Sequence, residues 1–194
     1  MLITITGPTC SGKSTLEKEF VSRFNCNKIT SFTTRPMRNG EVDTLDYFFL
    51  KEPPPFSEVV EQVEYNGNYY GIMKSEAEKA SGAVTVVVVE PHGVPQVERY
   101  RAANDIKIFK VFVDQALPVL VERFLRRSCG DIASNLKLSD YYAQRLISLI
   151  HEHETWYNPL MYDALLTGDS LVSQLRNYLI NFEFGEQENR EEEC

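Results

Sequence analysis

The stretch Gly7-Pro8-Thr9-Cys10-Ser11-Gly12-Lys13-Ser14 follows an apolar, β-branched run at residues 2–6 and opens a segment of helical periodicity at residues 13–24. It matches the pattern GxxxxGK[ST] in full, and a strand before the pattern with a helix after it is the context in which such a loop binds phosphate. Glycines let the backbone curl closely around a phosphate group. The amides that open the helix then favour the bound negative charge. The sequence therefore predicts a nucleoside triphosphate site.

Two side chains of this loop have expected roles. Lys13 reaches the β- and γ-phosphates, and the Ser14 hydroxyl ligates Mg²⁺ together with phosphates and waters. An ordinary tight turn between a strand and a helix would not need this Lys-Ser pair. The pattern leaves the acceptor of the phosphoryl group open, since switch GTPases and motor ATPases share it. The predicted ATP- and phosphate-binding residues are Gly7, Pro8, Thr9, Cys10, Ser11, Gly12, Lys13, Ser14 and Thr15.

Length and composition restrict the class of protein. The chain has 194 residues, 43% of them hydrophobic, which fits one globular domain with a sizeable core. The net charge of −8 disfavours nucleic-acid binding, which needs a basic surface. We expect no membrane partner, because no run of eighteen apolar residues occurs. The four cysteines lack CxxC spacing, and the apolar N-terminus does not resemble a signal peptide, so we expect a cytoplasmic, reduced protein without a zinc site.

Strand-like runs alternate with segments of helical periodicity along the chain. The run AVTVVVV at residues 83–89 is typical of a strand covered on both faces, as in a parallel sheet. This alternation favours an α/β, P-loop three-layer fold. Other strands are expected at residues 2–6, 106–113 and 162–166, and helices at residues 13–24, 116–127, 139–157 and 170–181.

Three segments interrupt this alternation. Residues 33–82 are rich in Arg, Gly, Asn, Pro and Tyr, and predict an inserted lobe with short antiparallel strands. Residues 128–138 are polar, lie between two predicted helices and are interpreted as a lid. Residues 183–194 hold six Glu and one Arg and are expected to be a solvated acidic tail. The remaining core is expected at residues 1–32 and 83–182, and the expected strands of the lobe lie around 46–50, 60–65 and 68–72.

Arginines in the lobe indicate a second phosphate site. Arg35 and Arg38 lie three residues apart in a Ser- and Thr-rich stretch, and paired guanidinium groups suit bidentate capture of a phosphate. Tyr47 and Glu61 follow, and then the segment YNGNYYG at residues 65–71.

The order of these segments after a phosphate loop resembles the guanylate kinase family. The blocks TTRPMRNGEVDTLDYFF and GNYYG, at residues 33–49 and 67–71, carry the resemblance, which runs from the phosphate loop to the last strand and weakens after residue 182. It implies a P-loop core with a helical lid and a lobe that binds the nucleoside monophosphate (NMP). It also implies transfer of a phosphoryl group from ATP to GMP or dGMP, assisted by Mg²⁺.

The resemblance assigns roles residue by residue. It implies that Glu61 reads the base, since a carboxylate accepts from both N1–H and the 2-amino group of guanine, whereas adenine presents an acceptor at N1. Glu90 and Ile72 occupy further positions of the acceptor site. The lid arginines Arg123, Arg127 and Arg145 stabilise charge on the transferred group together with Lys13 and Arg35, and Arg126 is a further candidate. The residues matched to the acceptor phosphate are Ser31, Arg35, Arg38, Tyr47 and Tyr70.

Some positions depart from the family pattern and leave alternatives open. Ile72 stands where the family has a polar side chain that helps to read the base, and Glu90 replaces an Asp. One alternative is therefore a kinase for another or a modified nucleoside monophosphate. A second alternative is a non-catalytic binding module, although such modules typically lack the P-loop lysine and the lid arginines. Small-molecule nucleotides are the expected partners, and the sequence does not distinguish a monomer from a homodimer.

Overall fold

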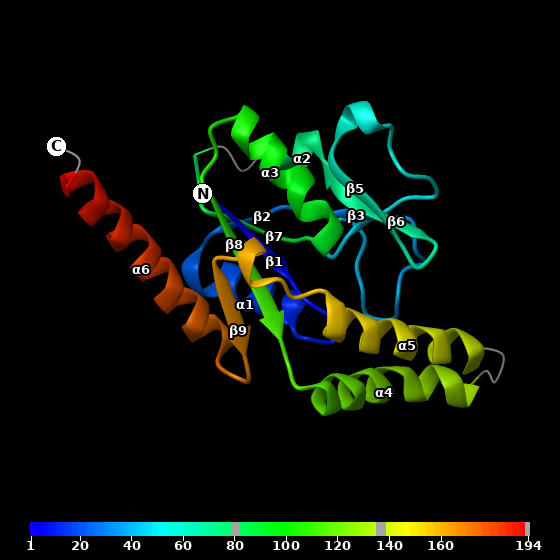
Figure 1. Cartoon of the computed structure of the whole chain (residues 1–194). Helices are drawn as coiled ribbons and strands as arrows, with labels where there is room; N and C mark the ends of the chain where they lie inside the picture. The colour runs from blue at the N-terminus through cyan, green and yellow to red at the C-terminus, as the bar shows by residue number, and fades with distance from the viewer. Residues whose placement is uncertain (79–81, 135–138, 193–194) are drawn as a thin grey trace. The chain divides into compact units, whose positions relative to one another are not determined.

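A computed structural model (Figure 1) describes residues 1–78, 82–134 and 139–192, with the backbone alone described for 129–134, 139 and 183–192. Contacts divide the chain into two compact units. The first unit comprises Met1–Gly7 and Lys13–Lys110, and the second comprises Pro8–Gly12 and Val111–Cys194. The phosphate loop thus changes unit twice within a few residues.

A five-stranded sheet carries the order β2-β7-β1-β8-β9. The pairs β1–β7, β2–β7 and β8–β9 are parallel. All five residues of β1 are buried, as expected for a strand covered on both faces. The predicted α/β fold with a parallel sheet is confirmed. The strands are β1 (Leu2–Thr6), β2 (Asn27–Lys28), β7 (Thr85–Val88), β8 (Ile108–Asp114) and β9 (Ala164–Thr167).

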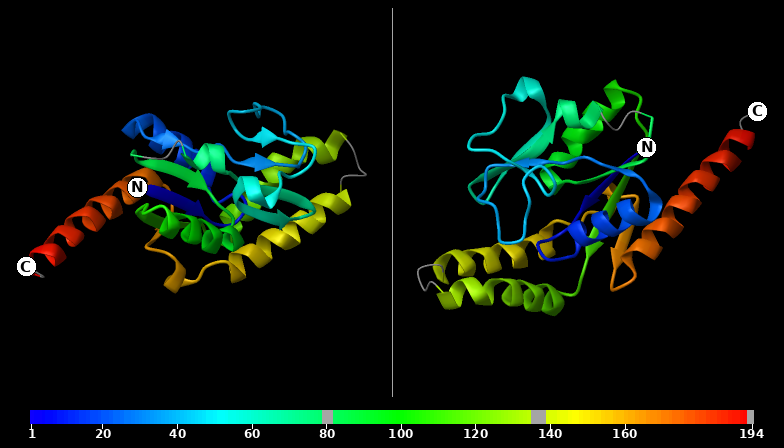
Figure 2. Two further views of the ribbon diagram at one scale, coloured as in Figure 1. Left: turned by 90° about the horizontal axis from the view of Figure 1, so that it is seen from above. Right: turned by 180° about the vertical axis from the view of Figure 1, so that it is seen from behind.

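The helices bury apolar stripes at helical spacing. In α1, Leu16 and Phe20 are 1% and 3% exposed. Helices α4 and α5 lie side by side (Figure 1), and Leu120 and Phe124 of α4 pack with Leu149 of α5. Helix α6 packs beside β9 and continues to the end of the described chain (Figure 2). The helices are α1 (Lys13–Phe24), α2 (Lys74–Glu78), α3 (Val94–Ala103), α4 (Leu117–Ser134), α5 (Ser139–Thr155) and α6 (Leu171–Glu192).

Two predicted boundaries were wrong. Helix α4 continues to Ser134, past its predicted end at residue 127, while residues 135–138 lie outside the described residues. Gly130 lies inside α4. A glycine in a helix lowers helix stability by about 1 kcal/mol relative to alanine, and the neighbouring residues of α4 offset this loss. Helix α6 continues to Glu192, into the predicted tail, because glutamate is a good helix former. The short α2 and the whole of α3 were not predicted.

The inserted lobe forms a second sheet of order β4-β3-β6-β5. Strands β5 and β6 form an antiparallel hairpin through Asn66-Gly67, a pair typical of tight hairpin turns. The antiparallel expectation was wrong for β4, which pairs parallel to β3 because the long connection between them returns the chain to its starting end. The strands are β3 (Phe32–Thr33), β4 (Phe48–Phe49), β5 (Val59–Tyr65) and β6 (Asn68–Met73).

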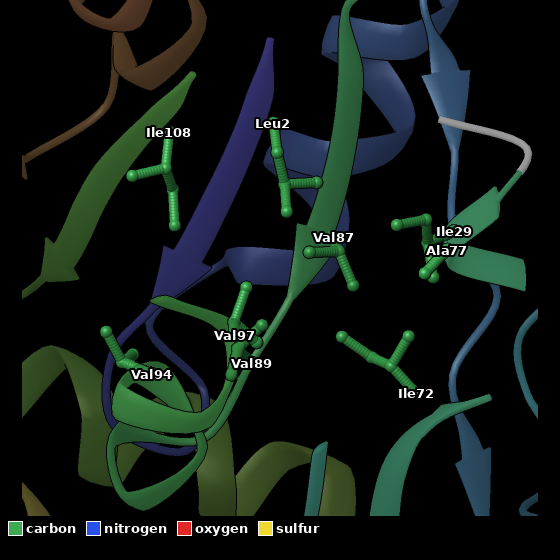
Figure 3. Close-up of a cluster of buried hydrophobic side chains, with 9 residues drawn as sticks. All are labelled: Leu2, Ile29, Ile72, Ala77, Val87, Val89, Val94, Val97 and Ile108. Carbon is green, nitrogen blue, oxygen red and sulfur yellow. The ribbon is translucent and has the colours of Figure 1, made fainter. Parts of the chain in front are cut away.

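One apolar cluster joins the two sheets within the first unit. Ile72 of β6 is 1% exposed and packs in a cluster with side chains from β1, β7 and α3 (Figure 3). This packing fixes β6, which also carries Tyr70, against the core. In the described part of the chain, no helix combines the length and the apolar composition needed to cross a membrane. The cluster consists of Leu2, Ile29, Ile72, Ala77, Val87, Val89, Val94, Val97 and Ile108.

Candidate active site

The phosphate loop lies between β1 and α1, as predicted. Gly7 and Gly12 adopt φ angles of 151° and 106°, which favour glycine, and Cys10 adopts 67°. The Lys13 Nζ atom donates a hydrogen bond of 2.6 Å to the Gly7 carbonyl. The Lys13 side chain therefore lies against the loop with which it is expected to bind phosphate.

The side chains around this loop fit a triphosphate and its cation. The Ser11 Oγ atom is buried and has no hydrogen-bond partner within the described residues. Ser14 and Thr15 are exposed in the first turn of α1. That first turn contains no acidic residue that would neutralise the positive end of the helix dipole. Backbone amides and an ammonium group donate hydrogen bonds to phosphate, and a hydroxyl oxygen can ligate Mg²⁺.

Two of the predicted lid arginines contact the phosphate loop within the second unit. The Arg123 Nη1 atom donates to the carbonyls of Cys10 and Ser11 at 3.2 and 3.4 Å. The Arg145 Nη2 atom donates to Thr9 Oγ1 at 3.3 Å. Both guanidinium groups therefore place positive charge beside the loop.

The other two arginines of α4 are exposed. Arg127 lies one turn beyond Arg123, on the same face of the helix. Arg126 forms an exposed ion pair with Glu122 at 2.7 Å, and its side chain is 80% exposed. The structure thus associates Arg123 and Arg145 with the loop, and it assigns Arg126 to a surface pair.

A second cluster forms around Arg35 in the first unit. The Arg35 side chain is 7% exposed, and its guanidinium donates two hydrogen bonds, of 2.6 and 2.7 Å, to the carboxylate of Glu41. Its Cζ atom lies 5.1 Å from the ring centre of Tyr47 and 5.4 Å from that of Phe49. Such stacking holds a guanidinium in one orientation.

Glu41 joins both predicted phosphate-binding arginines. It accepts a hydrogen bond of 2.8 Å from the Arg38 amide in addition to those from Arg35. Burial opposes its ionisation, but the hydrogen bonds from Arg35 and Arg38 outweigh burial and lower its pKa. Sequence reasoning missed Glu41, although its spacing in Arg-x-x-Arg-x-x-Glu, three residues after Arg38 and six after Arg35, was a visible signal.

The two predicted tyrosines lie together in this cluster. The rings of Tyr47 and Tyr70 meet edge to face with centres 6.2 Å apart. Burial, followed by the charge of Glu90, raises the pKa of Tyr47, so its phenol stays protonated and can donate to a phosphate. Ser31 is half-buried directly before β3, and its carbonyl accepts from the Phe48 amide at 2.9 Å.

Glu61 is a buried carboxylate on β5. It is 3% exposed, and its Oε1 atom has no hydrogen-bond partner among the residues described. Burial, followed by the charge of Glu90, raises the pKa of Glu61 to about 8. An unsatisfied buried acceptor is costly, so this position is suited to a ligand that brings hydrogen-bond donors.

The carboxylate of Glu61 depends on a glycine for its space. Gly93 ends the 3₁₀ turn Pro91–Gly93, and a methyl group added at Gly93 would overlap the Oε1 and Cδ atoms of Glu61. The Gly93 backbone, at φ −84° and ψ −25°, is open to any residue. A side chain at position 93 would therefore collide with the Glu61 carboxylate, whereas the backbone conformation there does not require glycine.

Replacing Gly93 with alanine is expected to displace the Glu61 carboxylate and weaken binding of a guanine nucleotide. A displaced carboxylate loses a hydrogen bond to the ligand worth about 1.5–3 kcal/mol, which corresponds to roughly 10–150-fold in affinity. Titration calorimetry with GMP measures the loss. The double variant Gly93→Ala/Glu61→Asp should recover part of the affinity, because the shorter acid relieves the overlap. Unchanged affinity in Gly93→Ala would contradict this arrangement.

The remaining two predicted acceptor-site residues, Glu90 and Ile72, lie in different surroundings. Glu90 follows β7, and its charge acts on both Glu61 and Tyr47. Ile72 pairs with Glu61 in the β5–β6 register, but its side chain lies in the apolar core. The roles given to these residues stay predictions.

Comparisons with known proteins identify relatives of this chain. The guanylate kinase of Chlorobium luteolum is 30% identical over 187 residues, which cover 92% of each chain. The enzyme of Sus scrofa is 27% identical and covers 87% of this chain and 85% of its own length. That of Mycoplasma pneumoniae is 33% identical over 75% of this chain and 65% of its own length.

A solved structure supports the fold. The guanylate kinase of Anaplasma phagocytophilum superposes with a TM-score of 0.63 at 19% identity, covering 96% of this chain and 86% of its own. The family model described as guanylate kinase matches residues 1–179. The chain therefore belongs to the guanylate kinase family, which confirms the predicted enzyme class, a nucleoside monophosphate kinase.

Proposed function

We propose that this enzyme transfers the γ-phosphoryl group of ATP to GMP or dGMP in the presence of Mg²⁺. The observation that carries the proposal is the buried Glu61 carboxylate, whose Oε1 atom lacks a partner among the described residues. It belongs to the same unit as the cluster of Arg35, Tyr47 and Tyr70. Guanine offers two adjacent donors to a carboxylate, whereas adenine would leave it unpaired.

On the acceptor side, the residues around Arg35 would hold the phosphate of the nucleotide. Glu41 fixes the Arg35 guanidinium, and the stacked rings limit its rotation. The phenols of Tyr47 and Tyr70, the hydroxyl of Ser31 and the exposed Arg38 complete the proposed set of donors. Ionised acceptors and guanidinium donors form the stronger class of hydrogen bond.

On the donor side, the phosphate loop would hold the triphosphate. Its amides and Lys13 bind the phosphates, and Ser14 would hold the cation. Mg²⁺ neutralises charge on the β- and γ-phosphate oxygens when bound. Arg123, Arg127 and Arg145 supply positive charge toward the transferred group. Such transfer needs little covalent chemistry from the protein, so positioning and charge stabilisation account for the rate.

The proposal also covers location and partners. We place the enzyme in the cytoplasm, with nucleotides as its ligands. Its net charge of −8 disfavours a nucleic-acid partner.

The acidity of Glu61 predicts a pH dependence of GMP binding. Its pKa of about 8 in the free protein exceeds the ordinary value of 4.5, so the side chain is protonated at neutral pH. Guanine donates to the ionised form, so binding must release this proton. The KM for GMP should therefore fall by roughly tenfold per pH unit as the pH rises toward 8 and level off above it. Steady-state kinetics from pH 6.5 to 9 measure the profile, and Glu61→Gln should flatten it.

The same shift has a consequence for stability. The folded protein keeps a proton on Glu61 between pH 4.5 and about 8 that the unfolded chain has released. The proton on Glu61 therefore adds to the free energy of unfolding. This addition is complete below pH 4.5, declines as the pH rises, and is lost once the pH has passed through about 8.

Transfer of labelled phosphate tests the proposed reaction. With γ-labelled ATP, GMP and Mg²⁺, the label should appear in GDP, and a chelator should stop the transfer. Label that appears only as inorganic phosphate would mean hydrolysis and would contradict the proposal.

A further inference from the structure

Two side chains of helix α5 form hydrogen bonds with one residue of the phosphate loop, Thr9. The Thr9 amide donates to Oε2 of Glu152 at 2.6 Å, and the Thr9 hydroxyl accepts from Arg145 at 3.3 Å. Glu152 is 1% exposed, and Arg145 is 8% exposed. All three residues belong to the second unit.

The two side chains share one face of α5. They lie seven residues apart, which is two helical turns, and Leu149 between them is fully buried. Leu149 packs with Leu120 and Phe124 of α4, and Cys10 of the phosphate loop packs against the same cluster. Apolar packing thus fixes the helix, and the two polar side chains fix the loop to the helix.

A buried carboxylate at this place needs an explanation. An ionised group loses solvation on burial unless hydrogen bonds replace water, and a negative charge beside a loop that binds phosphate opposes the ligand. The first effect is offset because the carboxylate accepts from the loop itself. Hydrogen bonds to charged groups are among the stronger ones in proteins.

We propose that Glu152 is a positioning residue for phosphoryl transfer. It fixes the Thr9 amide, and through Thr9 it sets the loop and the Arg145 guanidinium in one arrangement. The inference rests on the proposed function, because it assigns Arg145 and the loop to the donor phosphates. Glu152 itself touches neither substrate.

Two replacements of Glu152 separate positioning from structural support. Glu152→Gln keeps an oxygen that accepts from Thr9, whereas Glu152→Leu keeps the volume and removes the acceptor. We expect Glu152→Leu to lower kcat/KM for ATP by roughly 10–100-fold, the scale of a lost hydrogen bond to a charged group. The KM for GMP should change less than about twofold, and Glu152→Gln should recover most of the loss. Glu154→Leu is the matched control, because Glu154 lies exposed on the same helix.

Binding of MgADP, measured by titration calorimetry, gives a readout independent of turnover. At a temperature well below both melting temperatures, Glu152→Leu should bind MgADP more weakly than wild type. Equal losses for ATP and GMP, a loss that follows the melting temperature, or no loss in Glu152→Leu would overturn the inference. If the wild type phosphorylates no guanine nucleotide, the proposed function fails, while the MgADP comparison still decides the role of Glu152.

Discussion

Replacing Lys13 with alanine is expected to lower kcat for GMP phosphorylation by about 10³-fold or more. Lys13 is the ammonium group of the loop, and its Nζ atom already lies 2.6 Å from the Gly7 carbonyl. A single charge that stabilises the transferred phosphoryl group contributes about 10³–10⁵ in rate in enzymes of this kind. The melting temperature should change little, because the lysine is only partly buried.

A second lysine of α1 is the matched control. Lys18 is 61% exposed and pairs with Asp46 at 2.6 Å. Lys18→Ala should keep kcat within about twofold, since exposed ion pairs contribute little. A coupled assay of ADP release compares the two variants. Wild-type turnover in Lys13→Ala would show that the loop lysine is not part of the chemistry.

Replacing Glu61 with glutamine is expected to remove most of the preference for GMP over AMP. The amide is the same size, but its NH₂ group opposes guanine donors and suits the N1 acceptor of adenine. Sites that hydrogen-bond their substrate discriminate by about 10⁴–10⁵, so the ratio of kcat/KM values should fall by a large part of that factor. Both values are measured at pH 8.5, where Glu61 of the wild type is ionised.

Glu64→Gln controls for the loss of a negative charge from β5. Glu64 lies on the same strand but is exposed, and its replacement should leave the ratio of GMP to AMP unchanged. A Glu61→Gln variant with the wild-type ratio would mean that another residue reads the base.

Local patterns predicted much of the fold and part of the site. The phosphate loop was predictable because its chemistry depends on residues adjacent in the sequence, from Gly7 to Ser14. The buried strands β1, β7 and β8 were predictable because parallel strands are apolar on both faces. Arg35 and Tyr47 were found through local spacing and family resemblance, and the structure brings them together.

Features that depend on tertiary contacts were not predictable. The pairing of Glu152 with Thr9 joins residues 143 positions apart. The space that Gly93 leaves for Glu61 likewise comes from another element. From the sequence, Ile72 was interpreted as the loss of a polar side chain that helps to recognise the base. In the structure, its side chain packs in the apolar core with neighbours from several strands. Helix α3 was missed because its buried apolar side chains, Val94 and Val97, form a short stripe in a largely polar segment.

Turnover of the wild-type protein with Mg-ATP and each of GMP, dGMP, AMP, dTMP and dUMP tests the central claim most directly. We expect ADP release with GMP and dGMP alone, because only guanine satisfies a buried carboxylate at Glu61. Comparable turnover with AMP or with a pyrimidine nucleotide, or no turnover with any of the five, would contradict the account.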